Sequence, residues 1–115
     1  MKYTIKQAIL NSSQVKEVNS TSTYPDYYND YLDVLSRPTQ ALINKARYLY
    51  QTVGFIEAEN PGDVFHKGNV WDGFEDDIEH TGVSMHSISI GDVLIDESGN
   101  AIVVDRRGFT EITFN

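Results

Sequence analysis

The chain has 115 residues, which is enough for one domain and leaves little room for a second. It contains no cysteine, so disulfides, thiolate metal sites and a cysteine nucleophile are excluded. The formal net charge is −8 and is unevenly spread: residues 1–53 carry six Lys/Arg and four Asp/Glu, whereas residues 54–115 carry three Lys/Arg and thirteen Asp/Glu. Because this acidic half repels phosphate, we expect no direct nucleic-acid binding and a basic protein surface as the partner.

The N-terminal segment predicts a strand followed by an exposed loop. Residues 3–10 begin with alternating apolar and polar side chains, as in a half-buried strand. Residues 11–23 are rich in Asn, Ser and Thr, which predicts the loop. No apolar run resembles a secretory signal or reaches the about 20 residues of a membrane span, so we expect a cytoplasmic protein.

Two helices are predicted in the N-terminal half. The first spans about residues 26–35, where Asp26 is a candidate N-terminal cap and tyrosines and leucines recur at helical spacing. The second spans about residues 38–53, where apolar side chains line one stripe and Pro38 suits the first turn. Gly54 stands where a left-handed C-terminal cap is expected.

The middle of the chain has weaker signals. A short strand is predicted at residues 55–58, and residues 60–63 (Asn-Pro-Gly-Asp) predict a turn. Residues 71–81 combine acidic side chains with aromatic ones, and both a loop and a short helix fit this stretch.

The C-terminal part predicts an antiparallel β-meander over about residues 87–114. Strand-like runs at residues 93–95, 101–104 and 109–114 are separated by turn clusters at residues 97–100 and 106–108. Short turns between consecutive strands make them antiparallel neighbours. The sequence therefore predicts a single α+β domain over residues 1–115, in which this meander packs with the N-terminal strand and the two helices.

Recognised catalytic motifs are missing from the sequence. It has no phosphate-binding glycine loop, no nucleophile elbow and no His-Glu-x-x-His metal motif. Neighbouring acids such as Asp76 and Asp77 point in different directions on a helix or a strand, so they make a poor acid–base pair. We therefore expect no enzymatic activity and no cofactor. The alternative is a metal-dependent accessory enzyme in which His66, His80 and His86 converge.

The acidic stretch that begins at Trp71 is the most distinctive surface feature. Carboxylates spaced like phosphates can present a DNA-like surface to a DNA-binding protein. Aromatic side chains can anchor such a contact, and tyrosine is enriched at interfaces. The candidate partner-binding residues are Trp71, Asp72, Phe74, Glu75, Asp76, Asp77, Glu79, Tyr24 and Tyr27. The alternative is an acidic loop that only confers solubility, with Trp71 and Phe74 turned into the core.

One C-terminal motif resembles a known family. The run Ser-Ile-Ser-Ile-Gly-Asp-Val at residues 87–93, followed by Gly108-Phe109, resembles a pattern in small proteins of phages, plasmids and other mobile elements, some of them described as YodL-like. Asn69 and Trp71 are similar to an Asn-and-Trp segment that precedes the hairpin in that family. The resemblance covers residues 69–112 and implies an accessory role in a phage or mobile element. It implies no reaction and no catalytic residue.

Charge, missing chemistry and this resemblance together predict a binding module. We expect an acidic, non-enzymatic inhibitor of a host DNA-binding, defence or repair protein, such as an anti-restriction factor that mimics DNA and acts in the host cytoplasm. Besides the metal-dependent alternative, a structural protein that forms homo-oligomers through its Tyr-rich helix fits the same sequence.

Overall fold

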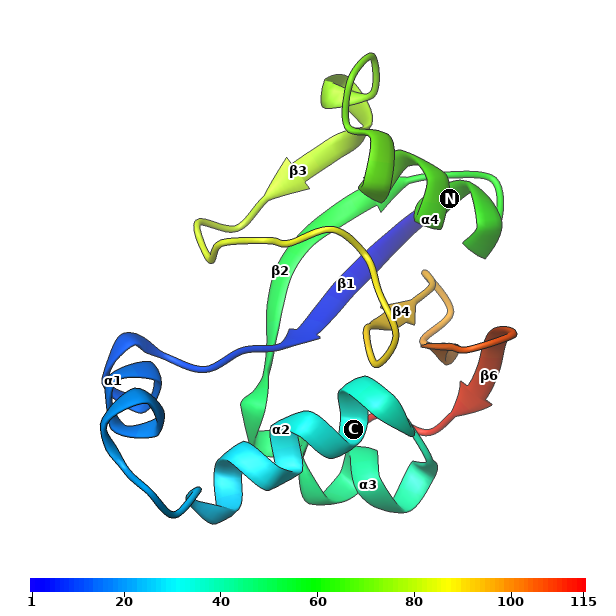
Figure 1. Cartoon of the computed structure of the whole chain (residues 1–115). Helices are drawn as coiled ribbons and strands as arrows, with labels where there is room; N and C mark the ends of the chain where they lie inside the picture. Colours follow the sequence, from blue (N-terminus) through cyan, green and yellow to red (C-terminus); the bar gives the residue numbers. More distant parts are fainter.

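Six antiparallel strands form one sheet in the computed structural model, which describes residues 1–115 (Figure 1). The strand order is β3-β2-β1-β4-β5-β6, so the first strand of the chain lies in the interior of the sheet. The strands are β1 (Lys2–Ala8), β2 (Tyr50–Glu57), β3 (Ile78–His80), β4 (Val93–Ile95), β5 (Ala101–Asp105) and β6 (Gly108–Ile112).

Helices lie near both ends of this sheet. Figure 1 shows α4 beside the N-terminus and α2 and α3 beside the C-terminus. The helices are α1 (Ser12–Ser20), α2 (Asp26–Ser36), α3 (Gln40–Lys45) and α4 (Pro61–Val70), with 3-10 turns η1 (Arg47–Leu49) and η2 (Glu75–Asp77). None of them has the length and apolar character that crossing a membrane requires.

The core is divided into two clusters on opposite faces of the sheet. Val103 and Val104 are neighbours on β5 but belong to different clusters, because successive side chains of a strand point to opposite faces. One cluster packs the sheet against Val64 of α4. The other packs it against Val34 of α2 and Ile43 of α3. Residues 71–80, which follow α4, therefore begin on the α4 face of the sheet. Helices α2 and α3 cover the opposite face.

The α+β fold and its meander agree with the sequence prediction. Strands β4, β5 and β6 pair in succession, β1 pairs with both β2 and β4, and α2 matches the first predicted helix. The meander begins at Val93, however, and residues 87–92 form a connection rather than a strand. Pro25, not Asp26, is the N-terminal cap of α2, with no side-chain capping bond.

The predicted helix at residues 38–53 is wrong. Only Gln40–Lys45 is α-helical; a 3-10 turn follows, and from Tyr50 the chain is strand β2. The apolar positions were correctly assigned to the core, since Ala46, Leu49 and Val53 are buried. Aromatic and β-branched side chains from Tyr50 onward favour a strand, and its pairing with β1 fixes that state. Gly54 is consequently no helix cap: a Cβ there would lie 2.7 Å from the carbonyl oxygen of Glu79 in β3.

Two predicted irregular segments are helical. Residues 11–23 contain α1, which a capping box begins: Asn11 accepts from the Gln14 N–H, and the Gln14 side chain accepts from the Asn11 N–H. The predicted turn at residues 60–63 is the start of α4, where Asn60 accepts from the Asp63 N–H. In both cases a residue typical of loops acts as a helix cap.

Gly91 offers a test of how tightly the two halves of the fold meet. It has φ of +94°, and a Cβ there would lie 2.5 Å from the carbonyl oxygen of Val34. Gly99 has a similar φ of +87° with open space around it. We expect Gly99→Ala to cost about 1 kcal/mol of unfolding free energy from backbone strain, and Gly91→Ala about 3 kcal/mol because a steric clash is added. Denaturant unfolding of both variants measures the difference, and equal costs would contradict the close approach.

Candidate functional site

The acidic segment, residues 71–80, runs from the end of α4 to the end of the edge strand β3 (Figure 1). Its aromatic side chains are half-buried and pack against the α4-side core. The Trp71 ring stacks on the His80 ring with centroids 5.3 Å apart, and Phe74 meets the His66 ring edge to face at 5.4 Å. Trp71 and Phe74 therefore hold the segment against the fold, which limits their availability to a partner.

Lys67 of α4 neutralises part of this acidic segment. Its ammonium group lies 3.1 Å from Asp77 and 3.4 Å from Asp63, and it donates to the carbonyl oxygen of Glu57 at 2.9 Å. The hydrogen bond to Asp77 is the main reason that the pKa of Lys67 lies above its usual value. Glu79 lies 3.5 Å from Lys2 in an exposed ion pair. Asp77 and Glu79 thus have cationic neighbours within the chain.

Asp72, Glu75 and Asp76 are the carboxylates of the segment that remain unpaired. All three are exposed and none takes part in an ion pair. Glu75 accepts a hydrogen bond from the Gly73 N–H at 3.3 Å, which ties it to its own loop. The structure therefore separates the predicted acidic residues into two that have ion-pair partners within the chain and three that have none.

The two candidate tyrosines differ in their availability. The Tyr27 hydroxyl donates to the Glu17 carboxylate and joins α2 to α1. Burial, followed by that hydrogen bond, raises the pKa of Tyr27 to about 12. Tyr24 is 55 % exposed and touches Tyr28 edge to face. Both lie on the α1–α2 side of the molecule, so they do not form one surface with the acidic segment (Figure 1).

The three histidines do not converge. His66 packs on Phe74, His80 stacks on Trp71, and the ring of His86 bonds to the carbonyl oxygen of Ser87. No group of three or more His, Cys, Asp or Glu side chains is arranged to hold a metal ion. The metal-dependent alternative therefore lacks the ligand set on which it depended.

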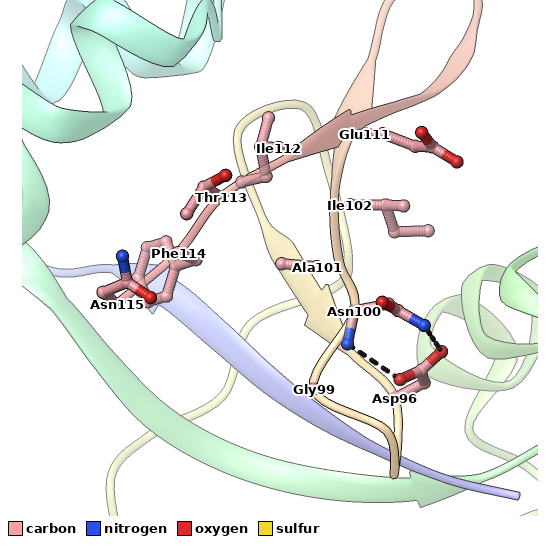
Figure 2. A pocket seen from close by; sticks show the side chains of 10 residues that line it. All are labelled: Asp96, Gly99, Asn100, Ala101, Ile102, Glu111, Ile112, Thr113, Phe114 and Asn115. Carbon is pink, nitrogen blue, oxygen red and sulfur yellow. Dashed lines mark hydrogen bonds between the residues drawn. The ribbon is translucent and has the colours of Figure 1, made fainter.

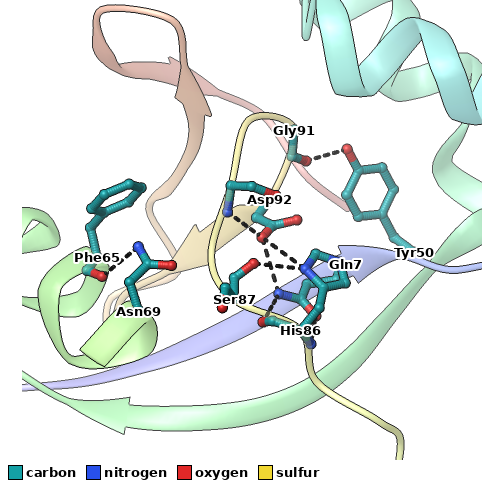
Figure 3. Close-up of polar contacts among 9 residues, drawn as sticks. Gln7, Tyr50, Phe65, Asn69, His86, Ser87, Gly91 and Asp92 are labelled. Atoms are coloured by element: carbon teal, nitrogen blue, oxygen red, sulfur yellow. Dashed lines mark hydrogen bonds and ion pairs between the residues drawn. The ribbon is translucent and has the colours of Figure 1, made fainter. Parts of the chain in front are cut away.

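The Ser-x-Ser-x-Gly-Asp-Val motif builds a buried polar network (Figure 3). Gln7 donates through Nε2 to the carbonyl oxygen of His86 (2.9 Å) and to Oδ2 of Asp92 (3.0 Å), and its Oε1 accepts from the His86 N–H (3.1 Å). The same Oδ2 accepts from the Ser89 N–H at 2.9 Å. Gln7 and Asp92 are almost fully buried, so these bonds satisfy groups that water does not reach.

This network identifies the motif as an anchor for the connection between β3 and β4. The Tyr50 hydroxyl adds a bond to the carbonyl oxygen of Gly91 at 2.6 Å. Gln7 was not singled out from the sequence. The signal was present, because Gln7 continues the inward positions of Tyr3 and Ile5 on the same strand, and a polar residue there requires a buried partner.

The largest grooves lie around the last hairpin, and their polar side chains do not form a cluster of catalytic groups. The groove in Figure 2 encloses about 520 Å³ and runs past the ends of β5 and β6. Its one carboxylate near the turn, Asp96, accepts from the N–H groups of Ser98 and Asn100 and so closes that turn. The groove therefore reflects the shape of the hairpin and not an assembled catalytic site.

No protein-family model, curated protein or solved structure matches this chain. The resemblance of residues 69–112 to mobile-element proteins stays a prediction. Function must consequently be argued from the surface and the contacts described above.

Asp92 makes the stability of the fold sensitive to pH. Burial raises the pKa of Asp92 from 3.8 to about 6, against the opposing hydrogen bonds from Ser89 and Gln7. A raised carboxyl pKa disfavours the ionised form in the folded state, so its contribution to stability is full below 3.8 and is lost as the pH rises through 6.

We expect Asp92→Asn to remove this dependence while keeping an oxygen acceptor for both donors. The unfolding free energy of the wild type relative to the variant should rise by about 2–3 kcal/mol as the pH falls from neutral through 6 towards 3.8. Denaturant titrations at several pH values measure this difference. A difference that stays constant across that window would contradict an ionisable, buried Asp92.

Proposed function

We propose that this chain is a non-enzymatic binding module of a phage or mobile element that captures a DNA-binding host protein through the acidic segment. The partner contributes a basic surface of the kind that normally contacts the DNA backbone. Capture blocks that surface in the host cytoplasm, so the chain acts as an inhibitor of defence, repair or restriction.

The observation that carries this proposal is the position of three unpaired carboxylates on an anchored loop. Asp72, Glu75 and Asp76 are exposed, and no Lys or Arg of the chain pairs with them. Lysine and arginine side chains that neutralise phosphates also accept carboxylates as partners, and long-range attraction speeds the encounter.

The anchoring contacts matter because an ordered loop loses less conformational entropy when it binds. Three contacts hold the loop on its packed side: Trp71 stacks on His80, Phe74 packs on the core, and Lys67 pairs with Asp77. The exposed Val70, 47 % accessible at the end of α4, adds an apolar group beside the carboxylates. In this arrangement the aromatic side chains position the acidic surface and do not themselves contact the partner.

Charge reversal at Asp72 and Asp76 tests the proposal without disturbing an internal ion pair. We expect the double variant Asp72→Lys/Asp76→Lys to lose capture of host proteins from lysate at low salt, because both reversals repel a basic surface. The matched control is Asp26→Lys/Asp33→Lys, which changes the net charge equally on the α2 side and makes no difference to capture.

Captured proteins are then assayed for DNA binding with and without the chain. The wild-type chain should compete with DNA for them, and high salt should weaken both interactions. Equal capture by the two double variants, or captured proteins whose DNA binding is unaffected, would rule the proposal out.

A further inference from the structure

Strand β6 is an edge of the sheet, and its outward backbone groups can be identified. Val104 donates to the carbonyl oxygen of Asp92 and accepts from the Gly91 N–H, both at 2.9 Å, so its backbone groups point away from β6. Val104 is the register partner of Phe109. In an antiparallel pair, residues opposite each other point their backbone groups either both inward or both outward. The N–H and C=O groups of Phe109, and with the same alternation those of Glu111, therefore point to the free edge.

The edge is closed at one position only. Thr113 has the same alternation, and the Gln40 side chain bonds both of its backbone groups: Nε2 donates to the Thr113 carbonyl oxygen (2.8 Å) and Oε1 accepts from its N–H (2.7 Å). The Gln40 amide thus takes the place that a neighbouring strand would occupy. Phe109 and Glu111 have no equivalent cap.

The open part of β6 lacks two of the features that often protect an edge strand, a proline and a bulge. It contains no proline, and its register with β5 shows no bulge. Phe109 is 38 % exposed, and it lines an apolar groove with Phe65 of α4, which is 41 % exposed. A second groove of about 530 Å³ runs between Thr110 and the α2–α3 connection, which leaves room beside the strand.

We propose that β6 pairs antiparallel with β6 of a second copy of this chain, with Phe109 on the two-fold axis. This register brings the hydrogen-bonding groups of Phe109 opposite those of its copy. It also brings Arg107, in the turn just before β6, close to Glu111 of the second copy. Neither of those two charged side chains has an ion-pair partner within the chain. Cross-strand pairs of opposite charge and of aromatic side chains are both favourable.

The alternative registers fit less well. With Thr110 on the axis, the turn residue Arg107 of the second copy would lie near Thr113, whose backbone groups Gln40 already occupies, and not near Glu111. With Phe109 on the axis, the paired segment ends at Glu111, just before that cap. Gly108 of the second copy then faces Thr110, so it brings no side chain toward the wall of the groove formed by the α2–α3 connection.

Single cysteines test the register directly, because the chain has none of its own. The Cα atoms of Phe109 and its copy should lie about 5.5 Å apart, which a disulfide can bridge. We expect Phe109→Cys to form a disulfide-linked dimer under mild oxidation. Glu111→Cys should form no disulfide-linked dimer in the same assay, because its two copies would lie more than about 13 Å apart along the strands. Cross-linking at neither position, or at both equally, would overturn the proposal.

Charge exchange tests the pairing without new covalent chemistry. Light scattering of the wild type should give twice the 13.0 kDa mass of the chain. Glu111→Lys brings a lysine close to Arg107 of the second copy, so charge repulsion should shift the mass to that of the monomer. Arg107→Glu/Glu111→Lys makes the two charges opposite again and should restore the dimer. A monomeric wild type at high concentration, or a double variant that remains monomeric beside a dimeric wild type, would refute it.

Discussion

The buried hydrogen bonds of Gln7 are the contacts on which the arrangement of the chain depends. Through them, the first strand holds the connection that leads from β3 across the sheet to β4. Asp92, at the end of that connection, also accepts from Val104 through its carbonyl oxygen and so positions β5. A glutamine placed between two apolar clusters is costly to bury unless each of its polar atoms is satisfied, and here both are. The network therefore favours one path for residues 81–92.

The same connection sets how closely the helices approach. Ile88 is buried against Gly68 of α4, where a Cβ would lie 2.4 Å from the isoleucine Cδ1. Gly91 lies against the backbone of Val34 in α2. One segment without regular structure thus contacts the helices of both ends of the sheet. This explains why the Ser-x-Ser-x-Gly-Asp-Val motif is structural.

The meander, α2 and the α+β class could be predicted because each depends on local signals. Short turns, β-branched runs and a helical spacing of apolar residues all act over a few positions. The strand β2 could not be predicted in full, because Tyr50 and Val53 stand three residues apart, which is the spacing of a helical stripe. In the strand they belong to different core clusters. Their state is decided by β1, which is distant in the sequence. Helices α1 and α4 were missed because Asn11 and Asn60 are common both in loops and in caps.

The features of the candidate site also differ in whether local sequence or distant contacts determine them. Composition identified the acidic segment, but not which carboxylates are free, because that depends on Lys67 from α4 and Lys2 from β1. The packing of Trp71 and Phe74 against the core likewise depends on residues distant in the sequence. The charge of a segment can be counted from its own residues, whereas its ion pairs depend on the positions of other segments of the chain.

The interior position of β1 also has a consequence for how the chain can fold during synthesis. Thr4 is made well before Ile95, which lies beside it in β4, one of its two neighbouring strands. The β1–β2 hairpin can form early, but it leaves an open edge on β1 until β4 emerges. Contacts between residues so far apart in the chain slow folding. A nascent chain would therefore expose this edge while residues 58–92 are made, which favours misassembly and aggregation at that stage.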